Sequence, residues 1–255
     1  MPFTFRSAIV VLVVWAMNCV CFAHDAWLGA RWNANKSQFL VTPLIGEHFA
    51  SGDPIKDHNR FLAPTAYVFG SVSLPLTSDT SDSTVLGAVP TTTNCVVSAG
   101  IKQREISYND TVALEYLTEE IGLKKEEALT YLTQGTKEYT ESYSRHLKTV
   151  ISSGQATPRD SVLDVPLQIH LLSWHKGKKA AIRFRVLEAG KPIASAPIRV
   201  LSAGKSVIAI ADKNGVAHAN VDAVGPVLIA YIQLSKVSEN RLRSVWTNLS
   251  IYRLQ

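Results

Sequence analysis

Cysteine is scarce in this sequence, and its distribution limits the class of protein. Two of the three cysteines, Cys19 and Cys21, lie within the first 23 residues, which leaves only Cys95 in the rest of the chain. A single cysteine cannot form a disulfide bond within the chain. The sequence therefore excludes the disulfide-rich secreted scaffolds and any Cys-x-x-Cys redox or metal motif.

Long apolar runs are absent after residue 23, so no later segment is expected to span a membrane. The N-terminus carries Arg6, then an apolar stretch over residues 8–20, and then Cys21-Phe22-Ala23. This order is typical of a secretory signal peptide, and the apolar stretch is shorter than the roughly 20 residues of a spanning helix. A retained membrane anchor is the alternative. We expect cleavage after Ala23, a periplasmic protein and no stable membrane insertion after cleavage.

Neither sign of charge dominates the sequence. Lysine and arginine number 26 against 21 aspartates and glutamates, a net charge of +5, and the excess is scattered apart from a cluster at residues 176–179. Nucleic-acid binding normally requires a concentrated basic face, which this sequence lacks. Together with the expected export, this predicts that nucleic acid is not a partner.

The motifs of common catalytic sites are missing too. The sequence has no Gly-x-Ser-x-Gly nucleophile motif and no His-Glu-x-x-His zinc motif. Gly204-Lys205-Ser206 matches part of a phosphate-binding loop, but Arg199 occupies the place of its first glycine and a predicted strand follows instead of a helix. Cys95 has no histidine nearby in sequence, which favours a buried thiol over a nucleophile. The sequence therefore predicts no enzymatic reaction.

Short strands are predicted over both ends of the chain. Residues 24–108 alternate short apolar stretches with Gly, Pro, Asn and Asp, which is typical of strands and turns. In residues 181–255, apolar and basic side chains alternate with period two, as in Ile182-Arg183-Phe184-Arg185-Val186. Asn214-Gly215 predicts a tight turn between two of these strands. Each end is therefore expected to form a β-sandwich.

The middle of the chain has a helical pattern. Asn109-Asp110 is a good N-cap pair, and apolar residues then recur every three to five positions until Gly122. A second short helix is expected around residues 126–132. A third is expected from Thr136, with one apolar face made of Tyr139, Tyr143, Leu147 and Val150.

Several short segments resemble a known family in their order along the chain. They are His24-Asp25-Ala26-Trp27-Leu28, Gly46-Glu47-His48-Phe49, Gly52-Asp53-Pro54, Arg60-Phe61, residues 116–123, residues 141–145, residues 190–198 and Asp212-Lys213-Asn214-Gly215. This set is similar to the periplasmic family called domain of unknown function 4198, formerly labelled a nickel and cobalt uptake component. The resemblance implies a binding or accessory protein for metal uptake or homeostasis, an envelope transport protein as partner, and a C-terminal Ig-like or carboxypeptidase-regulatory-like module.

The resulting prediction is a mainly β protein with two Ig-like β-sandwich domains and a helical insertion of two to three short helices between them. Its expected parts are a signal peptide (1–23), an N-terminal β domain (24–108), a helical segment (109–154), a connector (155–180) and a C-terminal Ig-like sandwich (181–255).

His24 is the first candidate metal ligand. Cleavage after Ala23 would make it the N-terminal residue, so that its α-amine and imidazole Nδ1 can bind one ion together. A third nitrogen from His48 would complete a site that suits copper or nickel, and the resemblance adds cobalt. Nearby residues form a weaker candidate set, namely Asp25, Glu47, Asp53, Asp57 and His58. The alternative is that these loop residues are simply solvated.

Two other functions fit the sequence. The first is a non-catalytic Ig-like envelope protein that contacts carbohydrate or a protein partner, with Trp27, Trp32 or Trp246 stacking on sugars. The second is a copper-dependent polysaccharide oxygenase, because an N-terminal histidine with a second imidazole resembles the histidine brace of those enzymes. Chelator sensitivity of binding separates the metal-binding hypothesis from the first alternative, and peroxide-dependent sugar oxidation would reveal the second.

Overall fold

The computed structural model describes most of the chain after residue 24. It covers residues 25–46, 49, 52–62, 64–68, 74–76, 83–89, 94–153, 156–175, 177, 179–222 and 225–254. The described chain is mainly β, as predicted, with short helices near its middle. Within these residues no helix is long and apolar enough to cross a membrane. The predicted signal peptide lies outside them.

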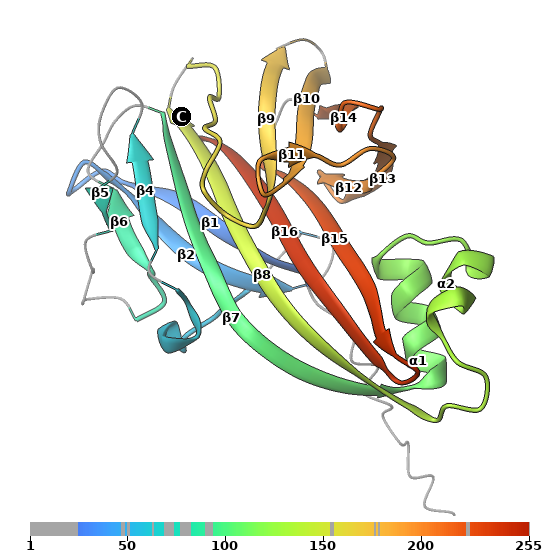
Figure 1. The fold of residues 1–255 in the computed structure, drawn as a ribbon. Coiled ribbons are helices and arrows are strands. Elements are labelled where there is room, and N and C mark those ends of the chain that lie inside the picture. The colour runs from blue at the N-terminus through green and yellow to red at the C-terminus, as the bar shows by residue number, and fades with distance from the viewer. Residues whose placement is uncertain are drawn as a thin grey trace, which may run out of the picture.

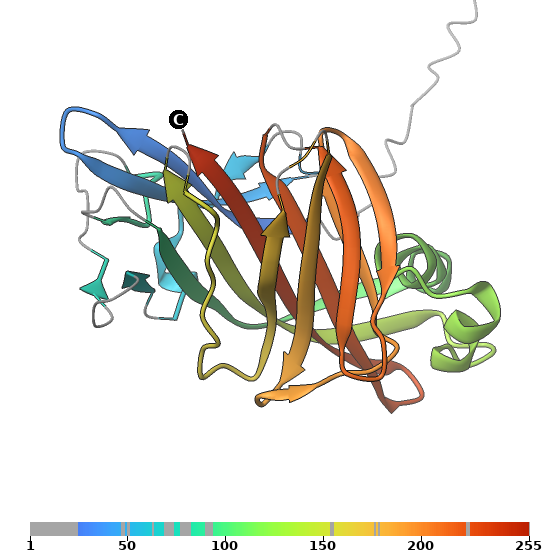
Figure 2. The same ribbon diagram turned by 90° about the horizontal axis from the view of Figure 1, so that it is seen from above.

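A single eight-stranded sheet runs through the molecule, and its long strands cross both views in Figures 1 and 2. In spatial order its strands are β13 (Lys205–Ile210), β12 (Pro197–Ser202), β15 (Val227–Ser238), β16 (Arg241–Leu254), β8 (Glu138–Ser153), β7 (Cys95–Asn109), β4 (Thr65–Val68) and β5 (Leu74–Pro75). Neighbouring strands are antiparallel except β16 and β8, which pair in parallel along the whole of β16. The sheet therefore joins the N-terminal and C-terminal parts of the chain.

Two smaller sheets cover opposite faces of this central sheet. The first sheet contains β1 (Asp25–Asn33), β2 (Gln38–Gly46), β3 (Asp53–Pro54) and β6 (Gly87–Val89). The second contains β9 (Leu167–His175), β10 (Lys179–Glu188), β11 (Lys191–Pro192) and β14 (Val216–Asp222). Successive side chains of a central strand point to opposite faces, so the central sheet contributes to two apolar clusters. Val97 packs in the cluster with the first sheet, and its neighbour Val96 packs in the cluster with the second.

A helical cap covers one end of the central sheet (Figure 1). It consists of α1 (Asp110–Glu115), the π-helical turn η2 (Tyr116–Glu120) and α2 (Lys125–Tyr131). The predicted N-cap is confirmed, because the Asn109 side chain accepts a hydrogen bond from the Val112 N–H at 2.9 Å. Tyr116 and Leu117 bury their side chains in one apolar cluster with Trp246 of β16.

The third predicted helix is wrong, because residues 138–153 form strand β8. Tyr139, Tyr143 and Leu147 are spaced by four, and this spacing places residues on one face of a strand as well as on one face of a helix. The segment is also rich in Thr, Tyr, Val and Ile, which favour strands. Pairing with β7 on one side and β16 on the other decides the outcome.

The strand pattern of the C-terminal part is confirmed. Ile182, Phe184 and Val186 of β10 are buried while Arg183 is exposed. The predicted tight turn is present as well, since Gly215 adopts a φ of 71° and donates its N–H to Asp212. Because the central sheet is shared by both parts of the chain, a division into two Ig-like sandwiches stays a prediction.

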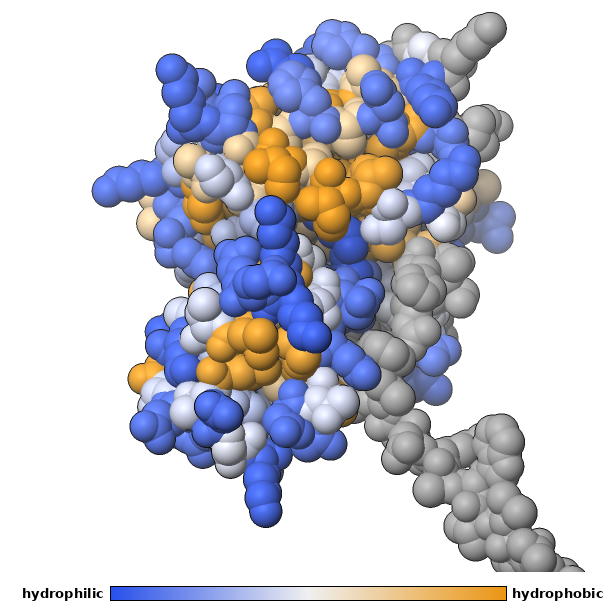
Figure 3. All heavy atoms as spheres, turned by 90° about the vertical axis from the view of Figure 1, so that its right-hand side faces the viewer, coloured by the Kyte–Doolittle hydropathy of each residue, from blue (hydrophilic) through white to orange (hydrophobic). Residues whose placement is uncertain are grey.

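Apolar side chains reach the surface on the side of the molecule that carries β13 and the helices. Figure 3 shows them in two areas with hydrophilic side chains between. Exposed large apolar residues of these elements are Val207, Ile208 and Ile210 on the edge strand β13 and Leu129 on α2. The edge strand of the central sheet therefore presents apolar side chains to solvent.

Candidate functional site

The first sheet brings the predicted metal-ligand segments to one end. Asp25, the first residue of β1, pairs with Gly46, the last residue of β2, and the preceding Ile45 pairs with Asp53 of β3. His24, Glu47 and His48 lie outside the described residues. In the sequence, His24 directly precedes Asp25, and Glu47 and His48 directly follow Gly46. The register thus places Asp25 and Gly46 at the same end of one hairpin.

Asp25 itself is held in a buried ion-pair network. Asp25 is 3% exposed, and its Oδ1 accepts a hydrogen bond from Arg199 Nη2 of β12 at 2.6 Å. Arg199 Nη1 lies 3.4 Å from Glu120 Oε2 at the end of η2. Three parts of the fold therefore meet at this guanidinium: the start of the first sheet, strand β12 of the central sheet and the helical cap.

Burial sets the charge balance of this network. It raises the pKa of Glu120, an effect that Arg199 opposes and the negative charge of Asp25 increases. Burial lowers the pKa of Arg145 on β8, while Tyr143 and Asp25 favour its charged form. The Arg145 guanidinium also lies 4.1 Å from the ring centroid of Trp246, a cation–π contact. The site thus contains one buried cation, Arg145, and one partly buried cation, Arg199, beside its carboxylates.

Glu141 of β8 is a second buried carboxylate below the helical cap. Its Oε1 accepts a hydrogen bond from the Tyr116 hydroxyl at 3.0 Å, and its carboxylate also accepts from Tyr108 and Ser244. Trp246 Nε1 donates to the Ser244 hydroxyl at 2.9 Å. Burial and the nearby Glu141 charge raise the pKa of both tyrosines, so their hydroxyls stay protonated and donate. This network fixes the cap on the sheet.

A buried asparagine of the central sheet, Asn248, lies close to the site. Asn248 of β16 is 1% exposed, and neither its Nδ2 nor its Oδ1 has a hydrogen-bond partner in the described part of the chain. It pairs with Ala230 of β15, which in turn pairs with Arg199, so all three side chains share one face. Buried polar atoms without partners are rare, and here they lie in the same row as the Asp25–Arg199 pair.

The weaker metal-ligand candidates are divided between two places. Asp53 is exposed at the end of the first sheet near Gly46. Asp57 and His58 lie at η1 (His58–Arg60), which leads to an isolated bridge between Phe61 and Ile101 of β7. In the described residues no group of three or more His, Cys, Asp or Glu side chains could hold a metal ion. A nitrogen-rich site at the end of the first sheet therefore depends on His24 and His48.

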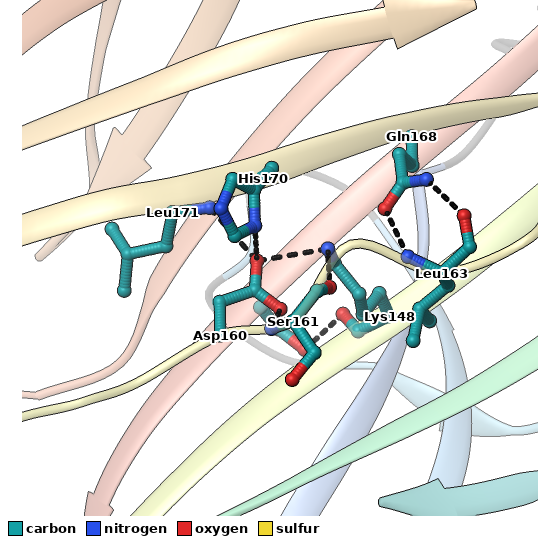
Figure 4. Close-up of polar contacts among 8 residues, drawn as sticks. Lys148, Asp160, Ser161, Leu163, Gln168, His170 and Leu171 are labelled. Carbon is teal, nitrogen blue, oxygen red and sulfur yellow. Dashed lines mark hydrogen bonds and ion pairs between the residues drawn. The ribbon is translucent and has the colours of Figure 1, made fainter. Parts of the chain in front are cut away.

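A separate buried cluster was not anticipated from the sequence, and Figure 4 displays it. The Asp160 side chain, which is 0% exposed, lies between Lys148 of β8 and His170 of β9. Its Oδ2 is 2.8 Å from Lys148 Nζ and 3.3 Å from His170 Nδ1, and it accepts the Leu171 N–H at 2.8 Å. His170 Nδ1 has no hydrogen-bond partner among the described residues, so its approach to Asp160 is a close polar contact rather than a hydrogen bond.

The Lys148 and Asp160 side chains of this cluster are buried, and they hold a loop in place. Burial alone would raise the pKa of Asp160, but the Lys148 ammonium and the Leu171 N–H hold it below its usual range. Gln168 of β9 fastens the same loop, since its side chain accepts from the Leu163 N–H and donates to the Leu163 carbonyl. The cluster therefore ties residues 160–163 between β8 and β9, which is a structural role.

The tryptophans proposed for sugar stacking are occupied in the core. Trp27 and Trp246 are buried. Trp32 is half-buried and packs edge-on against Phe39, with ring centroids 4.9 Å apart. Trp27 and Trp246 thus offer no surface to a sugar ring.

Comparison with known proteins leaves this geometry as the basis for a function. No family model, no curated protein and no solved structure matches the chain. The resemblance to the domain of unknown function 4198 family stays a prediction from the segments quoted above. The function is therefore argued from the register, burial and charge of the site.

Proposed function

We propose that the protein is a periplasmic binding or accessory protein that captures a transition-metal ion, either nickel, cobalt or copper, where β1 begins and β2 ends. The observation that carries the proposal is the pairing of Asp25 with Gly46. Asp25 follows His24 in the sequence and Gly46 lies two residues before His48, so this pairing supports a metal site shared by the two histidines.

His24 directly precedes Asp25 in the sequence, and His48 follows Gly46 by two residues. Because Asp25 and Gly46 pair, we propose that the two imidazoles bind one ion together. Asp53 adds a carboxylate at the same end of the sheet.

The buried ion pair supports a preorganised terminus. Because Arg199 holds the Asp25 carboxylate at 2.6 Å, the chain is anchored one residue after the predicted cleavage point. A ligand group on an anchored chain loses less conformational freedom when it binds than one on a free terminus. Arg199 also engages the Asp25 carboxylate, which leaves nitrogen donors of the terminus as the proposed ligands.

The test compares two forms of the processed protein, one beginning at His24 and one with a glycine added before it. Calorimetry with Cu²⁺ and Ni²⁺ should give an affinity at least about tenfold weaker for the extended form, the equivalent of about 1.4 kcal/mol. His48→Ala should weaken binding similarly, whereas His218→Ala, an exposed histidine on β14, serves as the matched control. Equal affinity of the two forms would refute the proposal.

A further inference from the structure

A groove lies between η1 and β7, apart from the site described above. It has a volume of about 230 Å³ and is lined by Asp57, Asn59, Arg60, Lys102, Gln103 and Arg104. The Phe61–Ile101 bridge and a hydrogen bond from the Leu62 N–H to the Gly100 carbonyl at 2.7 Å hold the two walls together. The groove is thus built on backbone contacts.

A bulge in β7 exposes the side chains that form one wall of the groove. Ile101 pairs with Arg145 and Arg104 pairs with Tyr143, so β7 has one more residue than β8 between these pairs. A bulge of this kind redirects side chains that regular alternation would send to opposite faces. Lys102, Gln103 and Arg104 are accordingly all exposed.

Positive charge in this groove is not neutralised. The three cations are Arg60, Lys102 and Arg104, and none of them forms an ion pair within the described residues. The neighbouring Glu105 is 3.6 Å from Arg241 instead. Asp57 is the one acid in the lining, and its Oδ1 accepts the Asn59 N–H at 3.3 Å. The groove therefore carries an excess of two positive charges.

The Arg60 side chain gives a second, independent indication that the groove binds a ligand. Its Nε is buried and has no hydrogen-bond partner in the part of the chain that the structure describes. A buried donor without an acceptor is costly, and an anion in the groove would supply the acceptor. The guanidinium fork suits the oxygens of phosphate, which forms paired hydrogen bonds with arginine.

We propose that this groove binds a phosphoryl anion, either inorganic phosphate or the phosphate of a lipid headgroup. Inorganic phosphate carries one to two negative charges near neutral pH and the phosphodiester of a lipid headgroup carries one, so either anion reduces the excess charge while its oxygens accept hydrogen bonds from arginine. The same three cations repel a metal ion, so Asp57 and His58 serve the fold at η1 rather than the metal site. The inference is independent of the proposed metal-binding function, because that proposal uses His24, His48 and Asp53, none of which lines the groove.

The experiment is a nuclear magnetic resonance titration of the processed protein, following the Arg60 Nε–H signal and the Lys102 and Arg104 amide signals. One arm adds inorganic phosphate, and the other adds phosphatidylglycerol vesicles with phosphatidylcholine vesicles as reference. Saturable shifts with phosphate identify a free anion, and shifts only with phosphatidylglycerol identify a headgroup; either result supports the proposal. Shifts equal to those caused by sodium chloride at matched ionic strength, or no saturable shift in either arm, overturn it.

Variants locate the binding to this groove. Arg60→Gln and Arg104→Gln should each weaken binding at least about tenfold, the loss expected for one charge-assisted hydrogen bond. Arg183→Gln, an exposed arginine on β10 in another sheet, should leave the affinity unchanged. Because Arg104 is exposed in a bulge, its variant is expected to fold even where Arg60→Gln does not. Unchanged affinity in Arg104→Gln would overturn the proposal, and unchanged Cu²⁺ binding in both variants keeps it distinct from the metal site.

Discussion

Replacing Asp160 by alanine should be among the most destabilising single changes in the described chain. The substitution leaves the Lys148 ammonium, whose side chain is 4% exposed, without its partner at 2.8 Å. It also removes the acceptor of the Leu171 and Ser161 N–H groups. Burial already lowers the pKa of Lys148, and the Asp160 carboxylate opposes this by favouring the charged form.

The expected magnitude follows from this burial. Removing one partner of a buried ion pair costs about 3–5 kcal/mol in the free energy of unfolding. For a protein of this size each kcal/mol lowers the midpoint of thermal unfolding by roughly 2–4 °C, so Asp160→Ala should lower it by about 6–20 °C. The exposed Arg241–Glu105 pair provides the contrast, because both side chains are more than half exposed and Arg241→Gln should cost less than about 1 kcal/mol.

A double-variant cycle tests the reasoning by thermal and urea unfolding. Lys148→Met combined with Asp160→Leu should be more stable than either single variant, since apolar side chains can replace a buried pair at little net cost. A loss below about 1 kcal/mol for Asp160→Ala, or losses that simply add in the double variant, would show that the pair is not coupled as the structure indicates.

The same pair predicts a pH dependence with a definite sign. The pKa of Asp160 is lowered in the folded protein, so its contribution is complete above the unfolded value of about 4 and is lost as the pH falls through the lower folded value. The stability difference between the wild type and Asp160→Ala should therefore be constant at neutral pH and shrink on acidification below about pH 4. A difference that grows on acidification would contradict this assignment.

Two further predictions concern single side chains. Burial raises the pKa of Cys95 to about 12, so a thiol reagent should not label the folded protein at neutral pH but should label it after unfolding; rapid labelling before unfolding would be inconsistent with this burial. Tyr116→Phe removes a hydroxyl 3.0 Å from the buried Glu141 carboxylate and should lower the free energy of unfolding in urea by about 1–3 kcal/mol. Tyr143→Phe is the control and should cost less, because the Tyr143 hydroxyl has no described hydrogen bond. Equal costs would refute a donor role for Tyr116.

Local signals in the sequence predicted the parts of the fold that local interactions determine. The N-cap at Asn109, the alternation along β10 and the turn at Gly215 each depend on residues a few positions apart. The helix expected after Thr136 failed because a spacing of four is shared by helices and strands. Only the pairing of that segment with β7 and β16 resolves the ambiguity, and such pairing has no local signal.

The candidate site was predictable only in part for the same reason. The sequence drew attention to the segments around His24 and His48, and the register of β1 with β2 brings their attachment points together. Arg199 could not be found this way, because it meets Asp25 across 174 positions of sequence. Asp160 likewise looks like an ordinary loop residue until β8 and β9 enclose it.

Strand β16 connects the two halves of the central sheet. It separates β15 from β8, which do not pair with each other, so neither half of the central sheet can join the other before residues 241–254 are synthesised. Assembly from such distant segments is slow compared with helical folding. Loss of this strand by proteolysis would open two long unpaired edges at once inside the central sheet, and such edges are templates for aggregation.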